Sequence, residues 1–120
     1  MAPLNLPLPT QYQGDTWPGF TLEAVLFDGA VPVINVLEAK LQFRSDTGEL
    51  GFEMKSNSTD ACKGSIIIQD PALWAISIVP TVLPLDARMW WWDLELTTET
   101  AVVITILKGR LRITSDITKR

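Results

Sequence analysis

Two acidic residues in the most aromatic stretch of the sequence have the spacing of a carboxylate pair. Asp93 and Glu95 lie within Met89–Leu96, and on a β-strand side chains two residues apart point to the same face. A carboxylate pair can hydrolyse a glycosidic bond or bind calcium. Two carboxylates on one exposed strand face are also common without any chemistry. We therefore expect a solvated strand face here, and a protein that is not an enzyme.

The other residue types that carry catalysis or bind metals are scarce. The chain has no histidine and a single cysteine, Cys62, which excludes the commonest general base, a cysteine zinc site and an internal disulfide. The 7 glycines are dispersed as turn residues and form no phosphate-binding loop. The sequence thus predicts no catalytic site, no metal site and no cofactor.

The charge of the chain argues against a nucleic-acid partner. The formal net charge is −4 and the pI is near 4.6, whereas binding to phosphates requires a basic surface. Basic residues gather only near the C-terminal end, at Lys108, Arg110, Arg112, Lys119 and Arg120. They could form a solvated strand face with a basic tail, or a phosphate contact, and we favour the solvated face. No window is long and apolar enough for a membrane-spanning helix, and residues 1–9 lack the pattern of a signal peptide. We expect no membrane partner.

The carboxylate pair requires a strand to position it, and the alternation of residues supplies one. Trp90, Trp92, Leu94 and Leu96 would share an apolar face, and the other face would carry Trp91 with the two carboxylates. Because a buried tryptophan removes roughly 200 Å² from water, this face can anchor a core. We predict that Met89–Leu96 is the central strand of a β-domain.

The rest of the chain also reads as short strands with frequent turn signals. In Val36–Arg44, Leu37, Ala39, Leu41 and Phe43 are expected to point one way, and this alternation favours a strand over a helix across residues 35–44. A bend or bulge is expected at Lys108-Gly109. Such spacing is typical of a β-sandwich or barrel. The other predicted strands are Trp17–Phe27, which ends in an Asp28-Gly29 hairpin, Leu50–Met54, Ser65–Gln69, Ala75–Val79, Ala101–Leu107 and Arg110–Thr114.

Residues 1–11 read as an extended, proline-rich arm in front of a single domain at residues 12–120. The arm would cap an edge of its own domain or reach onto a neighbour. Hydrophobic residues make up 47% of the chain, which fits either a surface covered by a partner or a well-filled sandwich. An exposed tryptophan is a recurrent interface anchor. The candidate interaction residues are therefore Pro3, Leu4, Leu6, Pro7, Leu8, Met89 and Trp91.

Several short motifs, in order along nearly the whole chain, carry a family resemblance. They are Tyr12–Pro18, Asp28-Gly29, Ile34-Asn35-Val36 leading into Leu41–Arg44, Trp92–Leu96, Leu107-Lys108-Gly109 and Ser115–Arg120. This order resembles the small immunoglobulin-like β-sandwich domains of tailed-phage virion proteins, including the N-terminal domain of phage upper baseplate proteins. The sequence departs from that pattern at Trp90–Trp92, where tyrosines are more usual, and in Ser56–Gly64, which matches nothing in it. The chain also stops where the baseplate protein continues.

The resemblance implies an immunoglobulin-like antiparallel β-sandwich of about seven or eight strands. It also implies a non-enzymatic structural component of the virion, assembled in the host cytoplasm and docking in the tail, baseplate or neck as an assembly or fibre-adaptor module. Its partners would be other virion structural proteins, in multiple copies of a symmetric assembly. Two alternatives are a head decoration protein on the capsid surface and a carbohydrate-binding module that uses Trp91 and Tyr12.

Overall fold

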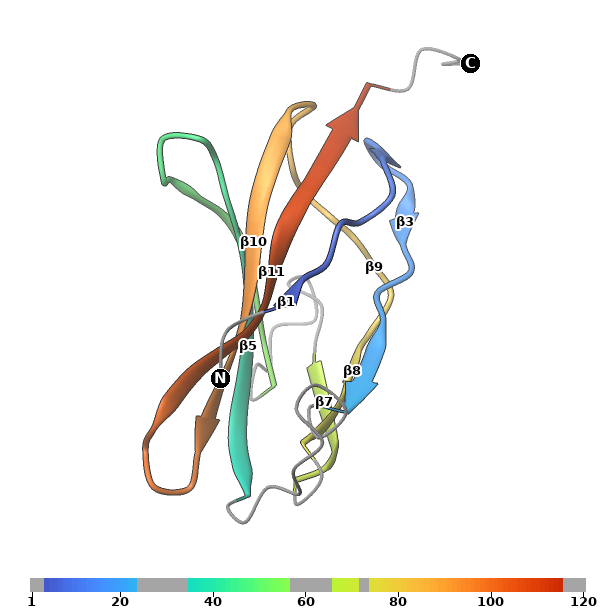
Figure 1. The fold of residues 1–120 in the computed structure, drawn as a ribbon. Helices are drawn as coiled ribbons and strands as arrows, with labels where there is room; N and C mark the ends of the chain where they lie inside the picture. The colour runs from blue at the N-terminus through green and yellow to red at the C-terminus, as the bar shows by residue number, and fades with distance from the viewer. Residues whose placement is uncertain (1–3, 24–34, 57–65, 72–73, 116–120) are drawn as a thin grey trace.

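The computed structural model describes residues 4–23, 35–56, 66–71 and 74–115, and these ranges consist of β-strands and their connections (Figure 1). Within them, the larger sheet has six strands. Its order is β1 (Leu4–Asn5), β11 (Val103–Thr114), β10 (Met89–Thr98), β5 (Val36–Arg44) and β6 (Leu50–Lys55), with β2 (Gln11–Tyr12) also paired to β11. The tryptophan strand β10 is therefore central, as predicted.

A smaller sheet packs against the inner face of the large one. It has the order β4 (Thr21–Glu23), β8 (Ala75–Ile78) and β7 (Ile66–Asp70), and a two-stranded ribbon joins β3 (Thr16–Trp17) to β9 (Thr81–Val82). With β4, β5, β7, β8, β10 and β11 taken as strands B, C, D, E, F and G, one sheet contains C, F and G and the other B, E and D. This confirms the all-β, immunoglobulin-like sandwich.

The core lies between the two sheets and is rich in aromatic rings. The ring centroids of Trp17 and Phe43 are 5.8 Å apart in an edge-on contact, and those of Phe20 and Trp92 are 5.9 Å apart. Because these pairs join β3 and the β3–β4 link to β5 and β10, they connect the layers directly. On β10 the predicted alternation is confirmed, since Trp90, Trp92, Leu94 and Leu96 are all buried.

The N-terminal arm caps an edge of its own sheet. Strand β1 pairs in parallel with β11, with Leu4 opposite Leu107, and the Leu6 backbone N–H donates to the Lys108 carbonyl at 2.8 Å. Leu6 and Leu8 pack, partly buried, against the core. A parallel strand covering β11 leaves fewer unpaired backbone groups at that edge. Of the two predicted roles, capping is the one found for the described part of the arm.

The prediction of one continuous strand at Trp17–Phe27 is wrong. The segment is broken into β3 and β4 by Pro18-Gly19, where Gly19 has φ +68° and where a Cβ would lie 2.2 Å from the Ile78 carbonyl oxygen. Proline removes a ladder donor and glycine permits the positive φ, so the chain bends there. Residues 24–27 of this prediction, the Asp28-Gly29 hairpin, most of the Ser56–Gly64 loop with Cys62, and residues 116–120 lie outside the described residues.

Two predictions fail because the bulges lie at other positions than the sequence indicates. Leu37 was expected inward, but it is exposed and Val36 is buried in its place, because the pairing shifts from Thr97–Glu38 to Thr98–Val36. The bulge predicted at Lys108-Gly109 is absent, and β11 runs through that position. The shift lies earlier, at Ile106, which is the extra residue. A bulge reverses which face each later residue occupies.

Candidate functional site

Within the described residues, the smaller sheet packs on the inner face of the large sheet, and β5, β10 and β11 form the middle of the outer face. Across the outer face, Trp91 is paired with Arg44 on one side and Arg110 on the other. One step along, Asp93 lies between Gln42 and Lys108. The pairing therefore brings together polar and aromatic side chains from three segments that are far apart in the sequence.

These side chains line an open hollow of about 580 Å³. This volume is within the roughly 300–1,000 Å³ that is usual for small-molecule sites. Trp91 is 41% exposed, in contrast to Trp92, which is 3% exposed. The residues used below to describe the hollow are Asn5, Gln42, Arg44, Trp91, Asp93, Lys108 and Arg110.

A second and smaller hollow of about 240 Å³ also reaches Trp91. Its wall includes Met89, Asp46 and Arg88. The Arg88 guanidinium lies 5.5 Å from the ring centre of Trp90, so this cation is engaged with the neighbouring tryptophan. The structure thus places the two predicted interaction residues of this strand, Met89 and Trp91, in one wall, although Met89 is partly buried.

The Arg44 side chain is held in place by a short hydrogen-bond network. Its Nη2 donates to Gln42 Oε1 at 3.1 Å and its Nη1 donates to the Gly48 carbonyl at 3.0 Å, while Gln42 Nε2 donates to Glu53. Burial alone would raise the pKa of Glu53, but the Gln42 hydrogen bond and the nearby Lys55 and Lys40 charges outweigh burial and lower it. The guanidinium is therefore oriented before any ligand arrives.

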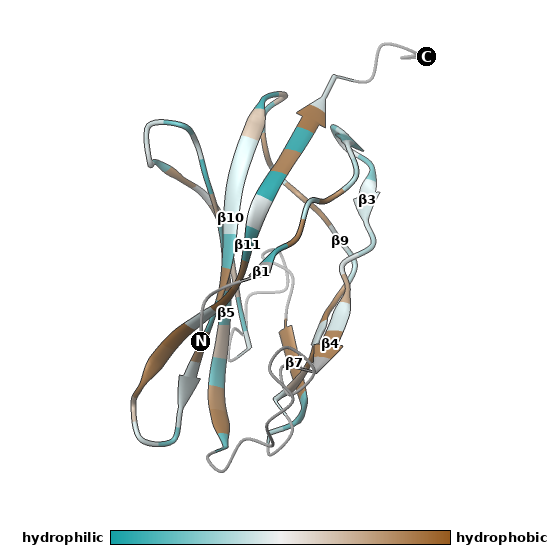
Figure 2. Cartoon of the chain, viewed as in Figure 1, coloured by the Kyte–Doolittle hydropathy of each residue, from teal (hydrophilic) through white to brown (hydrophobic). Residues whose placement is uncertain are grey.

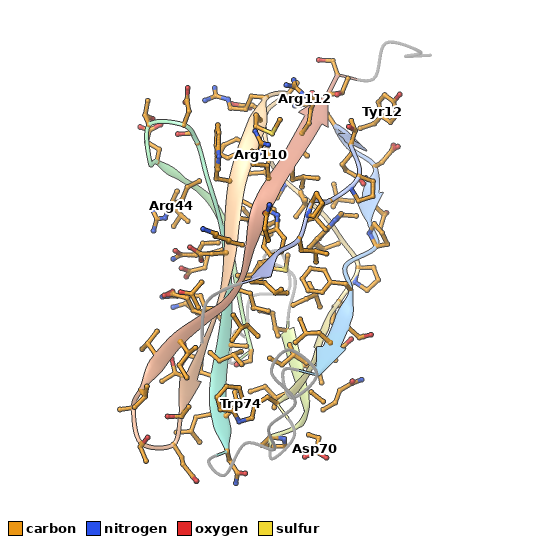
Figure 3. All side chains as sticks on the ribbon, in the orientation of Figure 1. Tyr12, Arg44, Asp70, Trp74, Arg110 and Arg112 are labelled. Carbon is orange, nitrogen blue, oxygen red and sulfur yellow. The ribbon has the colours of Figure 1, made fainter. Side chains whose placement is uncertain are left out.

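The hollow carries an excess of positive charge. Among the described residues, neither Arg44, Lys108 nor Arg110 makes an ion pair, and Asp93 is the one carboxylate in the wall. Figure 3 shows Arg110 and Arg112 following each other along β11, with Arg44 on the opposite side of β10. Arg110 and Arg112, for which a solvated strand face was expected, thus lie on the same sheet face as Arg44 of β5, with Trp91 of β10 between Arg110 and Arg44.

Asp93 is the unusual group of this wall. Its Oδ1 is buried and accepts no hydrogen bond from any residue in the described ranges. Burial raises the pKa of Asp93, the Glu95 carboxylate beside it raises the pKa further, and the positive charges of Arg44 and Lys40 act in the opposite direction. Glu95 itself is 3.6 Å from Lys40 in an ion pair, so the predicted carboxylate pair is divided between two environments.

The raised pKa of Asp93 predicts a pH-dependent gain from its replacement. A carboxyl that binds its proton more tightly in the folded chain lowers the free energy of unfolding as pH rises through the interval between its unfolded and folded pKa values. We expect Asp93→Asn to raise the free energy of unfolding at pH 7, and this advantage to vanish below the ordinary value of 3.8. Urea unfolding at several pH values measures it, with Asp46→Asn on an exposed turn as control. An advantage that is constant with pH would contradict this account.

The opposite end of the outer face is apolar. Leu37 and Val103 are 58% and 59% exposed, and Thr97 is paired with Val103 next to the bulge that turns Leu37 outward. In Figure 2 the start of β11 is a continuous hydrophobic segment. We refer to these two residues as the aliphatic end. Neither was singled out from the sequence, because the alternation grouped Leu37 with the buried residues of its strand and gave no face for Val103.

The remaining predicted interaction residues lie on the arm. Leu6 and Leu8 face their own core and Pro7 is exposed. Leu4 is placed by its backbone in β1, and Pro3 is outside the described residues. The role of these arm residues in binding a partner stays a prediction.

Several residues of the hollow were missed by sequence reasoning. Gln42 and Arg44 were assigned to the polar face of their strand, but nothing in the sequence indicated that this face adjoins Trp91. Tyr12, the other aromatic residue considered for sugar binding, is exposed on the far side of β11 from Arg44 in Figure 3 and is not part of the hollow wall. Finding these residues from the sequence would have required knowing that β5 pairs with β10.

The described part of the chain contains no group of three or more histidine, cysteine, aspartate or glutamate side chains placed to hold a metal ion. It also contains no helix of the length and apolar character needed to cross a membrane.

Comparisons with known proteins add little to this geometry. No protein-family model matches the chain, and no curated protein sequence matches it significantly. Among solved structures, CopC from Methylosinus trichosporium OB3b is similar over 92% of this chain and 89% of its own, with a TM-score of 0.45 and 8% sequence identity. We draw no functional conclusion from a likeness of that extent.

Proposed function

We propose that the chain is a non-enzymatic structural component of a tailed-phage virion. In this role it docks in the tail, baseplate or neck as an assembly or fibre-adaptor module, in multiple copies and against other virion proteins. Two features support the proposal. One is the sequence resemblance to phage immunoglobulin-like domains, and the other is an immunoglobulin-like sandwich in which, among the described residues, Leu37, Trp91 and Val103 are exposed on the outer face of the large sheet.

The exposure of the aliphatic end is the observation that best supports docking onto another protein. Two large aliphatic side chains, each more than half exposed, flank Thr97 at one end of the outer face in the described part of the chain. Covering such groups with a neighbouring protein contributes about 25 cal/mol for each Å² of apolar surface removed from water. In a symmetric assembly the same contact is repeated in every copy, so a weak single contact is sufficient.

A matched pair of valine variants tests this role. Val103 is 59% exposed at the aliphatic end, and Val82 is 49% exposed on β9 of the two-stranded ribbon. We expect Val103→Glu to reduce the amount of this chain in purified particles about tenfold or more, because a buried unpaired carboxylate opposes docking. Val82→Glu adds the same charge and should leave incorporation within about twofold. Quantitative mass spectrometry of purified particles gives the measurement.

The particle fractions also separate the alternatives. Absence of the wild-type chain from purified particles, or equal incorporation of the two variants, would overturn the docking proposal. Recovery of the chain on heads stripped of tails would instead favour the head decoration protein. A carbohydrate-binding module that uses Trp91 and Tyr12 requires the two rings to lie in one site, and only Trp91 lies in the hollow.

A further inference from the structure

The hollow around Trp91 has the chemistry of a binding site that is separate from the aliphatic end. Along β10, Trp91 and Thr97 are six residues apart, or about 20 Å at the 3.4 Å rise of an antiparallel strand. A ligand in the hollow therefore does not require the docking surface proposed above. The side chains of the hollow decide what that ligand would be.

The ring of Trp91 is available for stacking. In the described residues a cation lies over the ring of Trp90, but none lies over Trp91, which is 41% exposed at the hollow. The flat C–H face of a pyranose is apolar and packs on an aromatic face, whereas its hydroxyl edges need polar partners. Asn5 in the same wall supplies an amide group for such edges, whereas the Gln42 amide is already bonded to Arg44 and Glu53.

The cations of the wall select for a negative charge. Arg44 and Arg110 are the strand neighbours of Trp91 on its two sides, and Lys108 lies one step along β11. Guanidinium groups bind carboxylate and phosphate groups in a bidentate manner, and an oriented guanidinium loses less entropy on binding. The chain as a whole is acidic, with a net charge of −4, so it does not attract anions over its entire surface. The three cations therefore make the hollow a local site for an anionic group.

Asp93 distinguishes a sugar from an acidic peptide. Its buried Oδ1 needs a hydrogen-bond donor, which the described residues do not provide. A saccharide hydroxyl can donate to the Asp93 carboxylate where it lines the hollow, whereas an ionised glutamate or aspartate side chain has no proton to donate and is repelled by it. From the stacking surface, the cations and this acceptor together, we propose that the hollow binds a saccharide that carries a carboxylate or phosphate group.

Titration of the purified full chain, followed by calorimetry and by the tryptophan indole resonances, tests the site. The probes are trigalacturonate, glucose 1-phosphate, neutral galactotriose and hexaglutamate. We expect trigalacturonate or glucose 1-phosphate to bind with a millimolar or lower Kd, and galactotriose to bind at least tenfold more weakly because it lacks the charge. The two charged probes show which anionic group the cations prefer. Binding of neither, or equal binding of galactotriose, would overturn the proposal.

The variants locate the site and separate the two anionic ligand classes. Trp91→Ala and Arg110→Gln should each weaken binding of the charged saccharide about tenfold, whereas Tyr12→Ala and Arg112→Gln, outside the wall, should change it less than about twofold. Asp93→Ala should weaken saccharide binding and strengthen hexaglutamate binding. Unchanged binding in Trp91→Ala, or tighter binding of hexaglutamate than of either saccharide by the wild-type chain, would contradict the site. Circular dichroism confirms that each variant is folded.

Discussion

Replacing Trp92 by alanine is expected to lower the free energy of unfolding by about 3–5 kcal/mol, whereas the same change at the adjacent Trp91 should cost less than about 1 kcal/mol. Trp92 is 3% exposed and its ring centre is 5.9 Å from that of Phe20, so alanine would leave a cavity between the sheets. Trp91 points to the opposite face and is 41% exposed. Urea unfolding of both variants measures the difference.

A conservative variant sharpens this comparison. The Trp92 indole Nε1 is buried and has no hydrogen-bond partner in the described residues. Trp92→Phe keeps an aromatic ring and removes this unpaired donor, so we expect it to cost less than half as much as Trp92→Ala. Similar costs for the two alanine variants would mean that the alternation of β10 has been assigned to the wrong faces.

The second large effect is expected at Gly109, where the arm crosses β11. A Cβ at this position would lie 2.3 Å from the Leu6 carbonyl oxygen and 3.0 Å from the Trp92 Nε1. The contact with the Leu6 backbone is closer than a Cβ tolerates, and the contact with Trp92 is tight enough that the ring would have to shift. We expect Gly109→Ala to lower the free energy of unfolding by about 1–3 kcal/mol and to displace the arm from the sheet. Urea unfolding measures the cost, and amide exchange at Leu6 reports the displacement.

A shortened chain provides the control for the glycine variant. In a chain that begins at residue 10, the Leu6 carbonyl is gone, and most of the cost of Gly109→Ala should disappear. The two changes would then be strongly non-additive, as expected for groups in direct contact. Additive effects would show that the glycine is required for some reason other than the crossing of the arm.

Local alternation of polar and apolar residues was sufficient to predict much of the fold. It identified β10 and its buried face, it favoured a strand over a helix at Val36–Arg44, and it indicated a sandwich or barrel. The failures occur where the period of two is interrupted. Leu37 and Ile106 are extra residues in bulges, and Pro18-Gly19 breaks a strand that the alternation would continue.

Strand β9 and the buried residues after it were also missed. Thr81–Val82 lies in none of the predicted strands, yet it pairs with β3, and Leu83 and Leu85 are buried in the core. Two residues are too few to show any period, so nothing local marked them as structural. Their burial depends on the ribbon they form with β3, which is remote in the sequence.

The sequence by itself determined the class of the fold, the outward position of Trp91, Asp93 and Glu95, and the absence of histidine chemistry. Only the tertiary structure decided that Arg44 and Arg110 are the neighbours of Trp91, that the arm closes the β11 edge, and that the aliphatic end is exposed. The reason is physical. The face on which a side chain lies follows from its own strand, whereas its neighbours follow from pairing between distant segments, which the burial of the whole core selects.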